Sequence, residues 1–119
     1  MKNLFSPRYT LAVRNLATST SFYIDMLGFE LLNEYPGWSS LGRDNVVVML
    51  GECADERPAS EIGDHSYFAY IEVRDASMLF QEFETKGVTF IKTIQDEIWG
   101  MREFGIQTVG RILRMPHQR

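Results

Sequence analysis

The sequence predicts an α+β domain built from two diverged copies of one strand–helix–strand–strand–strand unit. Two observations carry this prediction. The same order of hydrophobic patterns occurs twice along the chain, and matching residues recur about 60 residues apart. The matching pairs are Val13-Arg14-Asn15 with Val73-Arg74-Asp75, Gly28-Phe29 with Gly87-Val88, and Trp38 with Trp99.

The first unit begins with a strand over residues 8–14, where apolar and polar residues alternate as in a strand that is buried on one face. A helix follows, which either Asn15 or Thr18 can cap. Apolar residues recur at helical spacing until Gly28, a residue that favours the left-handed conformation in which helices end. The three remaining strands are predicted at 29–34, 38–41 and 45–50.

The second unit follows a polar loop at 51–64, which is rich in Gly, Glu, Asp, Pro and Ser. Its first strand is predicted at 66–73 from renewed alternation, Asp75 caps the next helix, and Gly87 ends that helix. Its remaining strands are predicted at 88–93, 101–106 and 111–115.

Length and charge limit the function. A chain of 119 residues suits one domain, 1–119, whose modules span about 7–50 and 65–116. The net charge of −4 argues against nucleic-acid binding, which needs a basic surface. No apolar run is long enough for a signal peptide or a membrane span. Because the single cysteine, Cys53, cannot form an internal disulfide, we expect a cytoplasmic protein.

The two leading strands differ between their faces. One face is apolar and is expected to pack under the helices, whereas the other mixes charged, hydroxyl and aromatic side chains that a dry core would not tolerate unpaired. This mixed face is therefore expected to line a cavity for a small organic ligand. Its residues are Arg8, Thr10, Ala12 and Arg14 in one copy and Ser66, Phe68, Tyr70 and Glu72 in the other.

Two stretches resemble a known family. They are Asn15-Leu16…Ser19…Ser21-Phe22-Tyr23…Leu27-Gly28-Phe29 and Trp99-Gly100-Met101-Arg102-Glu103-Phe104-Gly105. Both resemble the vicinal-oxygen-chelate superfamily of glyoxalase I, bleomycin-resistance proteins and extradiol dioxygenases, and the second points to the bleomycin-resistance-like branch. The resemblance implies two βαβββ modules forming cupped mixed sheets with helices on the outer face. It also implies a homodimer, and it leaves open whether the modules are swapped between protomers.

Enzymes of this superfamily hold a divalent metal on the first and last strands of each module. The corresponding positions here are Arg8, Phe68, Arg114 and Val48, with Leu50 as the alternative to Val48 if the strand is shifted by one pleat. None of these side chains offers a carboxylate or an imidazole, so no metal and no cofactor are expected. His65 and His117 lack a partner at metal-type spacing and are expected to be exposed. No other catalytic motif occurs, so no catalytic residue is assigned.

The candidate ligand-binding residues are Arg8, Trp38, Phe68, Tyr70, Glu72, Trp99, Glu103 and Arg114. The two tryptophans either stack on a planar ligand or pack in the core or a dimer interface. Glu72 either meets a basic ligand or pairs with an arginine. Arg102 and Glu103 are expected to form structural ion pairs or rim contacts, and because adjacent strand residues face opposite ways, at most one of them enters the cavity.

If Arg8 and Arg114 both project inward, the cavity would prefer a carboxylate or phosphate over the basic drugs that bleomycin-resistance relatives bind. The favoured function is a metal-free binding protein that sequesters an antibiotic or other toxic compound as a homodimer. One alternative is a lyase, isomerase or dioxygenase of the same superfamily whose metal ligands are displaced or absent. Another is a structural or regulatory dimer with a vestigial pocket. Enzymatic activity is therefore left open.

Overall fold

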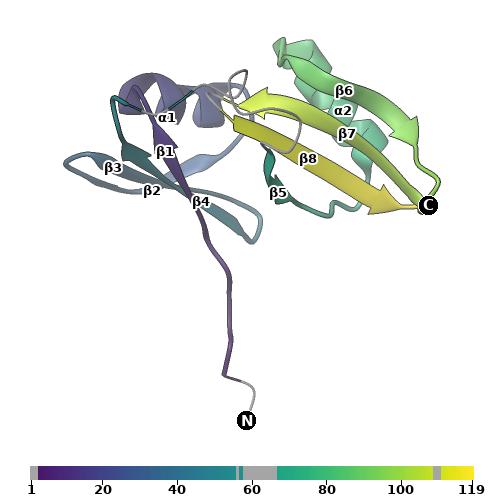
Figure 1. The fold of residues 1–119 in the computed structure, drawn as a ribbon, viewed down its shortest axis with the longest axis horizontal. Coiled ribbons are helices and arrows are strands. Elements are labelled where there is room, and N and C mark those ends of the chain that lie inside the picture. Colours follow the sequence, from purple (N-terminus) through teal and green to yellow (C-terminus); the bar gives the residue numbers. More distant parts are fainter. Residues whose placement is uncertain (1–2, 56, 58–66, 109–110) are drawn as a thin grey trace. The chain divides into compact units, whose positions relative to one another are not determined.

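The computed structural model describes residues 3–55, 57, 67–108 and 111–119. The chain divides into two compact units, one ending at Asp55 and the other extending to Arg119. Each unit holds one helix and one four-stranded mixed sheet, with the helix against its own sheet (Figure 1). The predicted α+β fold is therefore confirmed.

The first unit has its sheet strands in the order β1-β4-β3-β2. β1 runs parallel to β4, whereas the β4–β3 and β3–β2 pairs are antiparallel. Its elements are β1 (Tyr9–Val13), α1 (Leu16–Asp25), β2 (Glu30–Tyr35), β3 (Trp38–Arg43) and β4 (Val46–Glu52).

The second unit repeats this topology, with the strand order β5-β8-β7-β6 and a parallel β5–β8 pair. Its elements are β5 (Tyr67–Tyr70), α2 (Ala76–Lys86), β6 (Phe90–Asp96), β7 (Met101–Thr108) and β8 (Arg111–Gln118). The internal repeat predicted from the sequence is thus a repeat of element order and of strand pairing. The two tryptophans are not equivalent within it, because Trp38 begins β3 whereas Trp99 lies in the turn before β7.

Both helices are capped at their N-termini by a side chain that lies three residues from the N–H it accepts from. The Asn15 side chain accepts a hydrogen bond from the backbone N–H of Thr18, so Asn15 is the N-cap of α1. Asp75 does the same for α2 by accepting from the Met78 N–H. At the other end of α2, Gly87 adopts a φ of 83°, in the left-handed region that glycine enters without strain.

A third cap comes from a distant strand. His117 in β8 accepts a hydrogen bond at Nδ1 from the backbone N–H of Ala76, the first residue of α2, at 2.6 Å. His117 is therefore half-buried, and its predicted exposure is wrong. His65, the other histidine, lies outside the described residues.

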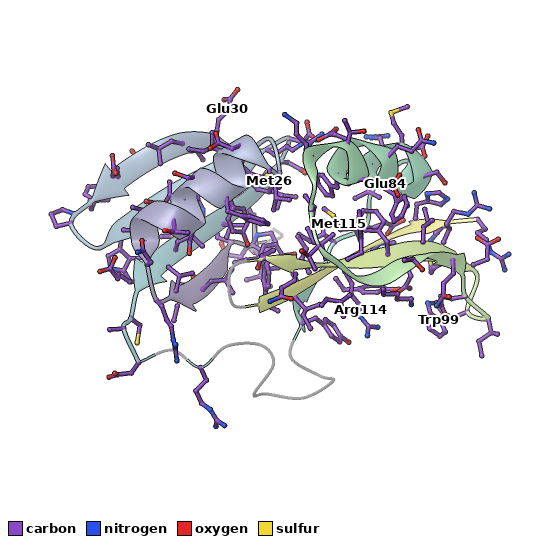
Figure 2. The ribbon with its side chains drawn as sticks, turned by 90° about the horizontal axis from the view of Figure 1, so that it is seen from above. Met26, Glu30, Glu84, Trp99, Arg114 and Met115 are labelled. Carbon is purple, nitrogen blue, oxygen red and sulfur yellow. The ribbon has the colours of Figure 1, made fainter. Side chains whose placement is uncertain are left out.

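Each sheet buries one face under its helix. In the second unit the ring of Phe104 in β7 lies 5.7 Å from Phe80 and 6.1 Å from Phe83 of α2, centroid to centroid. Figure 2 shows Met115 on this helix side of the sheet and Arg114 on the opposite side. We call the side of the second sheet opposite α2 its far face.

The first strand of the second unit departs from the predicted alternation. The β5–β8 register shifts between Tyr67 and Ala69, and β5 ends at Tyr70 rather than at Val73. Such an irregularity breaks the alternation of faces between the residues before it and those after it. Tyr67 consequently lies on the far face against Arg114, and its predicted place under the helix is wrong.

No helix among the described residues is long and apolar enough to cross a membrane.

Candidate functional site

A group of polar and aromatic side chains lies on the far face of the second sheet. They come from all four strands and from the turn before β7. Four of the predicted ligand-binding residues meet there, namely Tyr70, Trp99, Glu103 and Arg114. Figure 2 shows Trp99 and Arg114 projecting from this same side of the sheet. We call these four residues, with Tyr67, Lys92 and Glu97, the Glu103 cluster.

The centre of the cluster is the carboxylate of Glu103, which is fully buried. Its Oε1 accepts hydrogen bonds from the Tyr70 hydroxyl at 2.6 Å and from Trp99 Nε1 at 3.0 Å. Its Oε2 accepts from Lys92 Nζ at 3.0 Å. A buried charge is tolerated only when it is paired and hydrogen-bonded, and Glu103 meets both conditions.

These contacts set the ionisation of the cluster. Burial by itself would raise the pKa of Glu103, but the hydrogen bonds from Tyr70, Lys92 and Trp99 together outweigh it and leave the pKa below its ordinary value. Burial raises the pKa of Tyr70, and its hydrogen bond to Glu103 raises it further. Glu103 therefore stays an anion at neutral pH while Tyr70 keeps the proton that it donates.

Lys92 in β6 joins the cluster although the sequence did not single it out. Its Nζ lies 2.6 Å from Glu97 and 3.0 Å from Glu103, and 5.4 Å from the centroid of the Trp99 ring. The hydrogen bond from Lys92 lowers the pKa of Glu97 despite an opposing contribution from burial. Lys92 thus ties the turn that carries Glu97 and Trp99 to the strand that carries Glu103.

Arg114 in β8 forms the other cationic side of the cluster. Its guanidinium carbon lies 4.6 Å from the centroid of the Tyr67 ring, and its NH1 lies 4.0 Å from Glu103 Oε2. A Cβ added at Gly105 would meet Lys92 Cβ at 3.5 Å and Arg114 Cγ at 3.6 Å. The aliphatic parts of the Lys92 and Arg114 side chains therefore lie on either side of Gly105.

Arg102 lies on the other side of β7. It donates to Asp96 at 2.7 Å and to the Ser77 hydroxyl of α2 at 3.3 Å. The structural ion pair expected of Arg102 is confirmed, and Arg102 and Glu103 lie on opposite sides of the strand.

Of the other four candidates, three are joined to this network by no hydrogen bond or ion pair within the described part of the chain, namely Arg8, Trp38 and Glu72. Arg8 is exposed ahead of β1, and the Trp38 ring lies over Gly51, both in the first unit. Phe68 is half-buried at the register shift, and Glu72 is exposed beyond β5. Their roles remain predictions.

The metal-ligand positions of the superfamily can be located more closely from strand pairing. Arg114 pairs with Tyr70, and in the first unit Met49 pairs with Thr10. Thr10 and Tyr70 occupy matching positions of the repeat, since they lie 60 residues apart. Their partners Met49 and Arg114 are therefore equivalent, whereas Val48 and Leu50 are buried in the core.

Neither the arginine nor the methionine supplies the hard oxygen or imidazole donor that a divalent ion prefers. Both oxygens of Glu103 already accept hydrogen bonds. Within the described ranges, no three His, Cys, Asp or Glu residues group closely enough to hold a metal ion. The donors at these positions do not fit a divalent metal.

Comparison with known proteins agrees with this architecture. Residues 6–111 match the model of the Glyoxalase/Bleomycin resistance protein/Dioxygenase superfamily. A bleomycin resistance protein of Geobacillus stearothermophilus is 29% identical in an alignment of length 109, and the match covers 81% of this chain and 83% of the relative.

Solved structures show the same fold at lower identity. A superfamily member from Alicyclobacillus acidocaldarius has a TM-score of 0.81 at 18% identity, over 99% of this chain and 95% of the other. A bleomycin-binding protein from Streptomyces verticillus, solved with copper(II)-bleomycin, has a TM-score of 0.79 at 19% identity, over 100% of both chains.

Proposed function

Because the chain belongs to the Glyoxalase/Bleomycin resistance protein/Dioxygenase superfamily, we propose that it is of the bleomycin-resistance-like branch, binds a small organic molecule and sequesters an antibiotic or other toxic compound. The similar proteins include a bleomycin resistance protein and a bleomycin-binding protein. A protein of this kind protects by mass action, because each bound molecule is removed from the free pool.

The observation that carries the proposal is the combination of exposed rings and a fixed polar network in the Glu103 cluster. Trp99 is 55% exposed and Tyr70 is 44% exposed, although both are held through their polar atoms by Glu103. Rings that are fixed before a ligand arrives lose little conformational entropy when it binds. Aromatic faces with polar ends suit a planar organic ligand.

We propose further that binding needs no metal, which the donor chemistry at Arg114 and Met49 supports. A cytoplasmic location is part of the proposal, and the exposed unpaired thiol of Cys53 suits a reducing compartment.

A homodimer is also proposed. β2 is an edge strand of its sheet and exposes Leu31, Leu32 and Tyr35. Edge strands with exposed apolar side chains are available for pairing with another copy.

The test is isothermal titration of the metal-stripped protein with bleomycin, with copper(II)-bleomycin and with a panel of other antibiotics of both charges. We expect saturable binding of at least one compound, recovered with unchanged mass. Trp99→Ala should weaken that binding by about twofold to tenfold, since a stacked aromatic ring contributes about 0.5–1.5 kcal/mol.

Ile98→Ala is the matched control, because Ile98 lies in the same turn and is 99% exposed without a described contact. It should bind as the wild type does. Binding of no compound would overturn the proposal. A ligand recovered in altered form, or turnover that depends on an added metal, would instead establish the enzymatic alternative.

A further inference from the structure

Glu103 and Arg114, the two charged residues at the centre of the Glu103 cluster, differ in solvent exposure. The side chain of Glu103 is 0% exposed, whereas that of Arg114 is 31% exposed. A molecule that approaches the far face from solvent therefore meets the guanidinium and not the carboxylate.

The hydrogen-bonding capacity of the cluster is also one-sided. Glu103 accepts from three donors, and the Tyr70 hydroxyl both donates to Glu103 and accepts from Trp99 Nε1 at 3.3 Å. Arg114 carries five N–H donors, and its ion-pair contact among the described residues, from NH1 to Glu103 Oε2, is 4.0 Å long. Among the described residues, the exposed arginine thus keeps N–H donors free for a ligand, whereas both oxygens of the buried Glu103 already accept hydrogen bonds.

The arginine is also held in place. The Tyr67 ring lies 4.6 Å from the guanidinium carbon, the geometry of a cation–π contact. Stacking on a ring face leaves the N–H edges of a guanidinium pointing sideways, where a planar fork of two oxygens can bind. Arg114 is thus presented as a preorganised donor fork beside exposed aromatic rings.

We propose that Arg114, stacked on Tyr67, is the anchor for the carboxylate or phosphate of an aromatic ligand. This inference rests on the proposed small-molecule binding and adds the charge of the ligand. The rings of Tyr70 and Trp99 supply the surface for the aromatic part, and Lys92 is occupied by Glu97 and Glu103. Arg114 therefore carries the charge preference.

The test compares benzoate, phenyl phosphate and benzamidine, which share a phenyl ring but differ in the charge of the attached group. Binding is followed at low salt by the NMR shift of the Trp99 indole N–H, which is assigned with Trp99→Phe. We expect at least one of the two anions to bind about tenfold more tightly than benzamidine, a difference of about 1.4 kcal/mol. Whichever anion binds better identifies the group that the fork prefers.

Arg114→Gln should remove this preference, and Arg114→Lys should restore part of it, because lysine keeps the charge without the fork. Arg102→Gln is the control, since Arg102 is an arginine on the opposite side of the same sheet. It should leave the preference unchanged. Far-UV circular dichroism checks that each variant is folded.

Benzamidine binding as tightly as the anions, or an anion preference that survives Arg114→Gln, would overturn the assignment. Binding of bleomycin or another antibiotic without any binding of the two anions would also overturn it, while leaving the proposed function intact. If none of these compounds binds, both proposals fail.

Discussion

The hydroxyl of Tyr70 lies 2.6 Å from the carboxylate of Glu103, and this hydrogen bond joins β5 to β7 across the strand β8 that separates them. The bond makes Glu103 a structural centre of the far face as well as a neighbour of any ligand. Changes at Glu103 should therefore be visible in the stability of the protein without a ligand present.

Glu103→Gln should lower the free energy of unfolding by about 1.5–3 kcal/mol, because it removes the charge that strengthens three hydrogen bonds at a buried acceptor, while Lys92 keeps its pair with Glu97. Urea denaturation at pH 7 measures the loss. Asp96→Asn is the control, because Asp96 pairs with Arg102 at the surface, where ion pairs contribute little. Equal shifts of the denaturation midpoint in both variants would contradict the central role of Glu103.

The same carboxylate should make stability depend on pH. Its pKa is lower in the folded protein than its ordinary value, so the unfolded chain takes up the proton first as the pH falls. The stabilisation is complete above the unfolded pKa of about 4.3 and is lost as the pH falls through the lower folded value. The gap between wild type and Glu103→Gln should therefore narrow from pH 7 to pH 3.5. A gap of constant size would show that the charge of Glu103 contributes nothing.

The contact between His117 and α2 predicts a second stability effect. His117→Ala leaves the buried N–H of Ala76 without its acceptor, which should cost about 1–3 kcal/mol. Amide hydrogen exchange in the first turn of α2 should accelerate, whereas Gln118→Ala, an exposed neighbour, should change neither measurement. Unchanged exchange in His117→Ala would mean that the Asp75 cap alone holds the helix start.

Two strand glycines offer a matched pair of substitutions. An added Cβ at Gly51 would lie 2.7 Å from Trp38 Cη2, so the indole must move, whereas at Gly105 the nearest atom is 3.5 Å away. In a Trp99→Phe background, Gly51→Ala should shift the emission of Trp38 and cost about 1–3 kcal/mol, the usual range for overpacking. Gly105→Ala should do neither. An unshifted emission spectrum in Gly51→Ala would show that Trp38 does not rest on that strand.

Features set by neighbouring residues were predictable from the sequence. Asn15 and Asp75 reach N–H groups three residues away, and Gly87 ends α2 through its own backbone angle. The alternation of apolar residues likewise identified the first strand of each unit. These signals are local, so a single sequence carries them.

The composition of the Glu103 cluster was only partly predictable. The register shifts in β5 and β6 decide which way Tyr67 and Lys92 face, and nothing in the alternation of those segments marks the shifts. Strand parity predicted that at most one of Arg102 and Glu103 would enter the cavity, but the contact of Phe104 with α2 decides which side of the sheet each residue takes. His117 meets α2 across 41 residues of chain, a pairing that spacing alone does not indicate.

The exposed edge strand β2 leads to a prediction about assembly. Tyr35 is 66% exposed, and Leu31 and Leu32 are exposed on the same strand, which has a neighbour on one side only in its sheet. If a second copy covers this strand, sedimentation equilibrium should give twice the chain mass of 13.8 kDa. Tyr35→Lys should shift the equilibrium toward the monomer, because a charge at an apolar interface must be desolvated.

Met78→Lys is the matched control for that substitution, since Met78 is an equally exposed apolar residue on α2 rather than on β2. It should leave the association constant unchanged. A mass of 13.8 kDa at every concentration would exclude the homodimer. Equal weakening by both lysine variants would show that the dimer does not form through β2 in particular, because a general effect of added positive charge would then explain both.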